Sequence, residues 1–87
     1  MRSKTLPSFW KEYSRLDRAI QQRAKKAYQL WIENPSHPSL RFKCINSREN
    51  AWSVRISRNH RAVGLLEGDS VTWVWIGSHD DYEKFFG

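Results

Sequence analysis

The sequence predicts an α+β domain in which an N-terminal helical hairpin packs on a small, twisted, antiparallel-rich sheet of three to four strands, followed by a short C-terminal helix. Between residues 16 and 31 apolar side chains recur at helical spacing. From residue 40 onward they alternate with polar side chains at a period of two, which is typical of strands. A chain of 87 residues is too short to bury two cores, so a single domain is expected to span residues 1–87.

Two helices are expected before residue 35. Pro7 suits the first turn of a short helix, and Ser8 could cap it. Asp17 is the expected N-cap of a longer helix, which ends at Asn34-Pro35 because proline disfavours helical geometry in the preceding residue. The apolar stripe of the longer helix comprises Leu16, Ile20, Ala24, Ala27, Tyr28 and Trp31. Its other side is basic, which fits either a solvated surface or contact with a partner.

The strands follow a stretch that is stiffened by two prolines. Alternation predicts strands over residues 40–44, 52–57 and 61–66, with polar turns between them. Residues 71–76 are apolar on both faces apart from Thr72, which predicts a central strand covered on each side. The segment before the first helix, residues 1–6, fits either an edge strand or a disordered start.

A last helix is expected from Ser78, because an acid follows three residues later, at Asp81, as in a capping box. This start places His79 and Tyr82 three residues apart on one helical face, beside the end of the sheet. The two final phenylalanines are expected to pack this helix down. Asp80 and Asp81 are interpreted as capping residues.

The composition favours a polyanionic partner. Fifteen Lys and Arg against nine Asp and Glu give a net charge of +6 and a pI near 9.9. Between residues 41 and 61 only one acid, Glu49, accompanies six basic residues, which are Arg41, Lys43, Arg48, Arg55, Arg58 and Arg61. Arg41, Lys43 and Arg55 are expected on outward strand positions, and Arg61 opens the next strand.

Other functional classes find little support. No apolar run approaches the roughly 18 residues of a membrane span, and no signal-peptide core follows the N-terminus, so a soluble, cytoplasmic protein is expected. A single cysteine, Cys44, excludes an internal disulfide and fits a reducing compartment. The three histidines and this cysteine lack the spacing of a zinc site, so neither a metal nor another cofactor is expected.

Five features follow one another along the chain: the helical hairpin, the L-x-F-K stretch ending at Lys43, the S-V-R-I stretch with Arg55, the N-H-R-A-V stretch with Arg61 and the ending I-G-S-H-x-x-Y. In this order they resemble the RelE/ParE superfamily of toxins from bacterial type II toxin–antitoxin systems. The I-G-S-H ending is similar to that of the RNA-cleaving, RelE-like branch. This resemblance implies a ribosome-dependent, metal-independent mRNA endonuclease that inhibits translation. It also implies a cognate antitoxin, the ribosome and mRNA as partners.

Metal-free RNA cleavage needs a base for the attacking 2′-hydroxyl, a cation for the charge on phosphorus and an acid for the leaving 5′-oxygen. Arg61 is the expected cation and Arg55 its partner, since guanidinium holds two phosphate oxygens in a fixed fork. His79 is the expected acid, although a role as base stays open, and Tyr82 could stack a base or position the scissile group. The expected RNA-binding residues are Lys43, Arg41, Arg58 and Arg48.

Two alternative functions remain open. A ParE-like toxin would share the fold but inhibit DNA gyrase without cutting RNA, and a degenerate member would only bind antitoxin. No glutamate is obviously placed as a general base, because Glu49 lies in a loop. His37 is interpreted as a surface loop residue, and His60 is expected to point away from Arg61 towards the opposite face.

Overall fold

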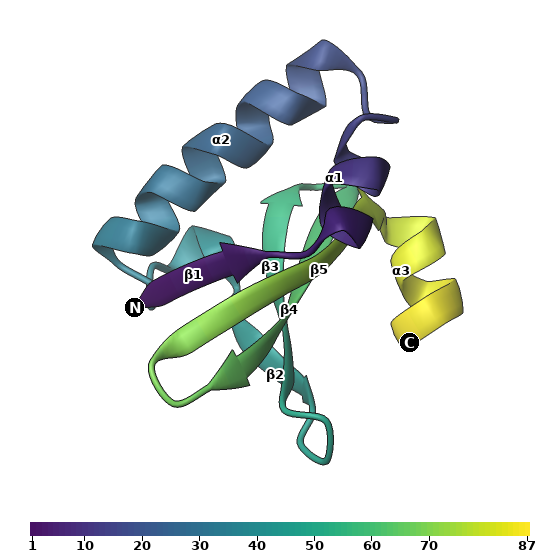
Figure 1. The fold of residues 1–87 in the computed structure, drawn as a ribbon. Helices are drawn as coiled ribbons and strands as arrows, with labels where there is room; N and C mark the ends of the chain where they lie inside the picture. The colour runs from purple at the N-terminus through teal and green to yellow at the C-terminus, as the bar shows by residue number, and fades with distance from the viewer.

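The computed structural model describes residues 1–87 and has the predicted α+β architecture (Figure 1). In chain order the elements are β1 (Arg2–Thr5), α1 (Pro7–Tyr13), α2 (Arg18–Glu33), the 3-10 helix η1 (Pro38–Leu40), β2 (Lys43–Asn46), β3 (Ala51–Ser57), β4 (His60–Glu67), β5 (Ser70–Ser78) and α3 (His79–Phe86). The strands form one sheet in the order β1-β5-β4-β3-β2. Helices α1 and α2 cover one face, and α3 lies against the other.

The sheet has five strands rather than three to four, because the segment before α1 is an edge strand. β1 pairs in parallel with β5, and the Leu6 backbone N–H extends the pairing by donating to the Trp73 carbonyl over 3.0 Å. The strand expected from Leu40 starts only at Lys43. Leu40 instead ends η1 and is buried, and Arg41 turns the chain in the left-handed region with a φ of 46°.

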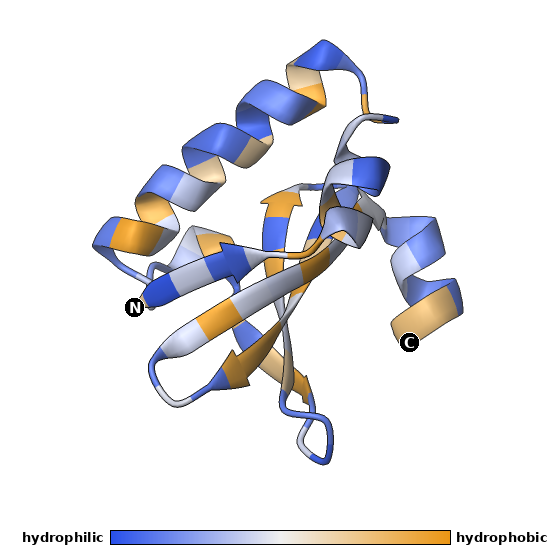
Figure 2. Cartoon of the chain, in the orientation of Figure 1, coloured by the Kyte–Doolittle hydropathy of each residue, from blue (hydrophilic) through white to orange (hydrophobic).

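The larger core lies between α2 and the sheet. Trp31 is its centre, with only 1% of its surface exposed, and it meets the rings of Trp73 and Phe42 edge-on at 5.2 Å and 5.8 Å. Ala24 and Ala27 bring α2 close to the strands because they carry only a methyl group. Figure 2 shows the result: hydrophobic residues follow the strands, and the outer side of α2 is hydrophilic.

A smaller core lies under α3. Tyr82 packs there with Ala51 and Val63, and Phe86 contacts the Trp75 ring at 5.2 Å. β5 is therefore covered on both faces, as predicted for residues 71–76. Phe85 packs less closely than predicted: its ring meets that of Trp75 edge-on at 6.3 Å, but 62% of the residue is exposed. None of the helices combines the length and apolar character that crossing a membrane requires.

Side-chain caps fix the starts of the two helices that flank the sheet. Asp17 Oδ1 accepts from the Ile20 N–H at 3.0 Å, which confirms Asp17 as the N-cap of α2. Ser78 caps α3 in the same way by accepting from the Asp81 N–H at 3.1 Å. Ser8 does not cap α1, because Pro7 already occupies the first turn and the Ser8 hydroxyl donates to the Val74 carbonyl.

Gly64 lies where the register between β4 and β5 shifts, and it packs against the larger core. A Cβ at this position would collide with the Val71 side chain and lie 2.8 Å from the Trp73 ring, and both residues are buried. We expect Gly64→Ala to lower the free energy of unfolding by about 1–3 kcal/mol, as overpacking typically does. Urea denaturation measures this loss. The exposed neighbour provides the control: if Leu65→Ala costs as much, the close contact at Gly64 is not the cause.

His60 lies on the α2 side of the sheet end, where its Nδ1 is 3.0 Å from Ser57 Oγ. Burial lowers the pKa of His60; Asp17 opposes this shift and Arg61 adds to it. Because the unfolded chain then binds a proton more readily, stability should fall as pH drops through the ordinary histidine pKa of about 6.5. We expect His60→Gln to reduce the fall in melting temperature between pH 7.5 and pH 5. A fall of the same size in His60→Gln and in the wild type would refute the assignment to His60.

Candidate active site

The central feature of the site is a pair of arginines on the α3 side of the sheet. Antiparallel register places Arg55 of β3 directly opposite Arg61 of β4, as the short turn between them predicted. Lys43 is opposite Ser53, so its side chain belongs to the same face. Neither arginine has a carboxylate partner, because the ion pairs of the structure are Glu12–Arg15 and His79–Glu83. The fold therefore presents two adjacent positive charges that form no ion pair.

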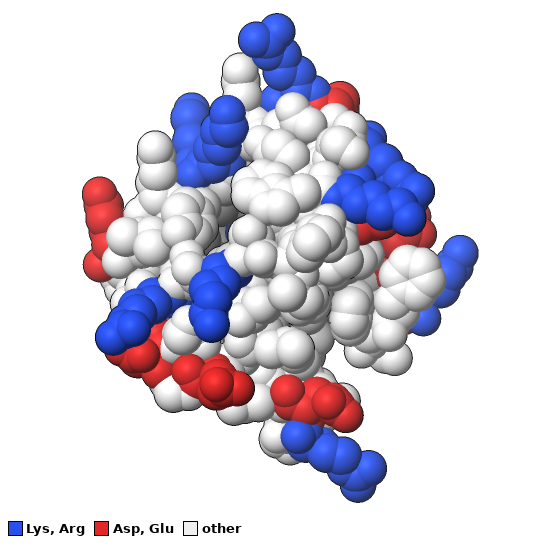
Figure 3. Space-filling view, in the orientation of Figure 1, with Lys and Arg blue, Asp and Glu red and all other residues white.

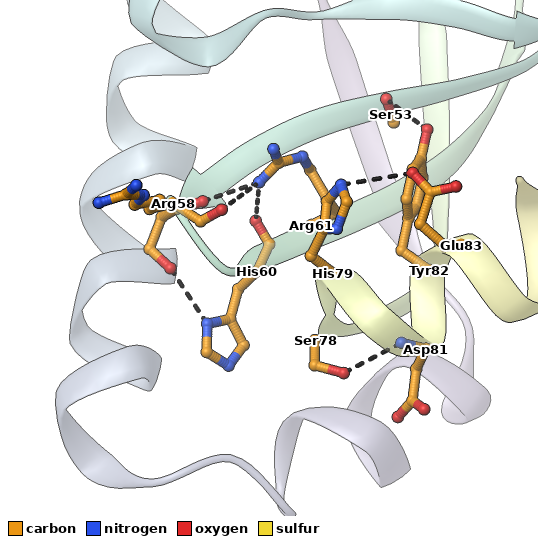
Figure 4. A network of polar contacts seen from close by, with 10 residues as sticks. Ser53, Arg58, His60, Arg61, Ser78, His79, Asp81, Tyr82 and Glu83 are labelled. Atoms are coloured by element: carbon orange, nitrogen blue, oxygen red, sulfur yellow. Dashed lines mark hydrogen bonds and ion pairs between the residues drawn. The ribbon is translucent and has the colours of Figure 1, made fainter.

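The Arg61 guanidinium is held in place by the turn that precedes it (Figure 4). Its Nη1 donates to the carbonyls of Ser57 and His60 at 2.8 Å and 2.9 Å, and more weakly to that of Arg58 at 3.4 Å. Nη2 and Nε make no hydrogen bond within the protein and are left for a ligand. Burial, and then the positive field of Arg55, lower the pKa of Arg61, yet arginine titrates so high that it stays charged near neutrality.

Helix α3 brings His79 beside this pair. The His79 backbone N–H donates to the Asn59 carbonyl at 2.6 Å, which ties the start of α3 to the β3–β4 turn. Its ring lies 5.9 Å from that of Tyr82, as the helical spacing predicted, and next to Arg61 in Figure 4. The ring is 3.4 Å from Glu83, measured from Nε2 to Oε1, and 41% of the histidine side chain is exposed. His79 is thus fixed at its backbone and open to solvent at its ring.

Tyr82 is buried rather than displayed. Only 8% of its surface is exposed, and its hydroxyl donates to Ser53 Oγ at 3.4 Å across the sheet. A ring in this position cannot stack on an RNA base at the surface. It instead supports α3 from below, between the His79 ring and Phe86.

Glu83 is the site residue that the sequence interpretation missed. It lies one turn after His79, faces the imidazole and contributes to the electrostatic field at Arg61. The i,i+4 spacing on the predicted last helix was the available signal, since residues four apart on a helix are neighbours. Glu49, the glutamate considered from the sequence, lies in the turn after β2.

The four expected RNA-binding residues do not form one group. Arg41 lies close enough to Arg61 to lower its pKa, after the effects of burial and Arg55, and Lys43 shares the face of the arginine pair. Arg58 is in the β3–β4 turn, but its side chain points away from the Arg61 guanidinium (Figure 4). Arg48 lies in the β2–β3 turn, at the opposite end of β3 from Arg55.

The charge distribution around the site is uneven. In the view of Figure 3, negative side chains gather where β4 turns into β5, and positive side chains stand along α2. His60 points away from the Arg61 guanidinium, as expected (Figure 4). Nowhere do three or more His, Cys, Asp and Glu side chains gather closely enough to hold a metal ion. The arrangement can bind an anion between Arg55 and Arg61 and offer it a proton-transfer group, His79.

Comparison with known proteins identifies relatives of this chain. The family model described as a ParE-like toxin domain matches residues 18–84. No curated protein matches the chain significantly.

Solved structures resemble the whole fold. The RelE of a RelB–RelE antitoxin–toxin complex from Methanococcus jannaschii matches with a TM-score of 0.76 and 18% identity, over 97% of this chain and 99% of that one. A YoeB/ParE toxin from Agrobacterium tumefaciens matches with a TM-score of 0.70 and 19% identity, over 91% and 99%. YafQ from Escherichia coli matches with a TM-score of 0.73 and 13% identity, over 93% and 97%.

At these identities the solved structures establish the shared fold, and the family match covers most of the chain. The chain therefore belongs to the ParE-like toxin domain family, and it shares its fold with a RelE toxin.

Proposed function

We propose that this toxin is a ribosome-dependent mRNA endonuclease that stops translation. The observation that carries the proposal is the Arg55–Arg61 pair, which has no carboxylate partner and has His79 beside it. Two adjacent guanidinium groups suit a phosphate, which could accept hydrogen bonds from both and would relieve their mutual repulsion. A neighbouring imidazole adds the proton transfer that phosphate binding alone would not need.

In this proposal the 2′-hydroxyl gives its proton to solvent water, and its oxygen attacks the adjacent phosphorus. A new P–O2′ bond forms and the bond to O5′ breaks. The products are a 2′,3′-cyclic phosphate and a free 5′-hydroxyl. Arg61, through Nη2 and Nε, stabilises the charge that builds on the phosphate oxygens, and Arg55 and Lys43 hold the phosphate. His79 gives its proton to the departing O5′. Glu83 orients the imidazole and partners its protonated form, and Tyr82 positions α3 from beneath.

We also propose that a cognate antitoxin restrains this activity. The structures that match this fold include an antitoxin–toxin complex, RelB–RelE. The basic surface of this chain, with its net charge of +6, would favour an acidic partner.

The ParE-like family match supports a second candidate, inhibition of DNA gyrase by binding alone. A toxin that only binds has no chemical use for an imidazole whose exposed ring faces an arginine pair. The two candidates therefore differ in what His79 is needed for.

The role of Arg61 can be tested by primer extension on a reporter message in a translating extract. We expect cuts at ribosome-occupied codons, and a loss of about 10²–10³-fold in cleavage rate for Arg61→Ala. Arg61→Lys should recover only part of this loss, because lysine lacks the planar fork.

Arg2→Ala removes an exposed arginine from β1, an edge strand that does not pair with β3 or β4, and should cut like the wild type. An intact message together with accumulating gyrase cleavage complexes would replace this proposal with gyrase inhibition. Cleavage that survives Arg61→Ala would retain the activity but refute the site.

The coupling between Glu83 and His79 gives a separate prediction. His79→Gln should lower the cleavage rate by at least about 10²-fold, as the loss of a general acid does. Glu83→Gln should cost up to about fivefold, since exposed ion pairs contribute less than about 1 kcal/mol. The double variant should be no slower than His79→Gln alone, because Glu83 acts through the imidazole. Additive losses in this double-mutant cycle would show that Glu83 acts independently.

A further inference from the structure

A second basic feature lies outside the site, in a groove between α2 and the outer edge of β3. Its volume is about 580 Å³. The charged residues that line it are all positive: Arg23 and Lys26 from α2, and Arg55 from β3. No Asp or Glu lines it. A groove with this lining selects an anion.

The groove is open because β2 does not run the length of β3. The two strands pair only as far as Ser53, where Lys43 is the partner. Before Lys43 the chain forms η1 and then turns in the left-handed region at Arg41. The outer edge of β3 from residue 54 to 57 therefore has no neighbouring strand, and α2 and η1 form the opposite wall.

Arg55 connects the groove to the site. It lines the groove and is also the cross-strand partner of Arg61. Lys26 and Arg23 lie one helical turn apart on α2 and continue the positive charge away from the site. A ligand that begins between Arg55 and Arg61 and carries regularly spaced negative charges can follow this path.

The remaining lining residues indicate how such a ligand would be held. The hydroxyls of Ser39 and Ser57 are already engaged with the rings of His37 and His60. The floor consists of Ala27, Leu30, Leu40 and Ile56, which offer an apolar surface but no donors. Recognition in the groove therefore depends on the cations, and it cannot read base identity.

From these observations we infer that the groove between α2 and β3 binds the sugar–phosphate backbone of the RNA strand that adjoins the phosphate held by Arg55 and Arg61. The inference rests on the proposed endonuclease function and adds to it the path of the substrate. It favours RNA over an acidic protein segment because the groove shares Arg55 with the phosphate site.

The test measures binding of a 2′-O-methyl RNA oligonucleotide, which cannot be cleaved by 2′-hydroxyl attack, across a range of salt concentrations. The double variant Arg23→Ala/Lys26→Ala should bind more weakly and show a slope of log K against log[salt] that is shallower by about 1.4, or 0.7 for each lost phosphate contact. The matched control, Arg18→Ala/Lys25→Ala, removes the same charge from α2 at positions that do not line the groove and should retain the wild-type slope.

A 2′-O-methyl dinucleotide, which reaches only the arginine pair, should bind the wild type and the groove variant equally. Equal slopes for the two double variants, or no RNA binding by the wild type even at low salt, would overturn the inference. So would an unchanged RNA affinity with weakened binding of an acidic peptide. If the wild type binds RNA through the groove but cuts no message, the endonuclease proposal is refuted and the proposed RNA binding in the groove is retained.

Discussion

The register of β3 against β4 places Arg55 directly opposite Arg61. Like charges in this cross-strand position repel each other, which lowers the stability of the sheet. Other parts of the structure accommodate the cost. The β3–β4 turn directs two of its carbonyls at Arg61 within 3 Å, and the burial of this residue is only partial. The fold therefore keeps two cations close together and without a carboxylate, an arrangement that a bound anion would stabilise.

The larger core and the candidate active site lie on opposite faces of the sheet. The α2 face contains the larger core around Trp31, and the candidate active-site residues lie on the other face and on α3. Gly77 contributes to this separation. It is opposite Arg61 in β5, and the space that its Cβ would fill is taken by the Trp75 ring, so residue 77 itself adds no side chain beside Arg61.

Local chemistry made much of this molecule predictable. Asp17 and Ser78 were identified as helix caps because their roles depend on residues within one turn. The position of Arg55 opposite Arg61 was predictable because the short turn between the two strands fixes their register.

Features that depend on distant parts of the chain escaped the sequence interpretation. β1 was ambiguous because Arg-Ser-Lys-Thr shows no apolar alternation and its partner, β5, is far along the chain. The alternation of apolar and polar residues also includes Leu40 and Arg41, so the sequence predicted a strand there. In the structure these two residues belong to η1 and to a left-handed turn that precede the strand. The contact between Glu83 and His79 depends on side-chain conformations that spacing alone does not determine.

The placement of α3 separates the proposed chemistry from the larger core. The core around Trp31 contains no residue of α3, whereas His79, Tyr82 and Glu83 all lie within its eight residues. A nonsense or frameshift mutation close to codon 79 would leave the larger core complete and remove the proton-transfer group of the proposed site together with its supports. Under the proposed function, selection for cells that escape the toxin should therefore recover late truncations.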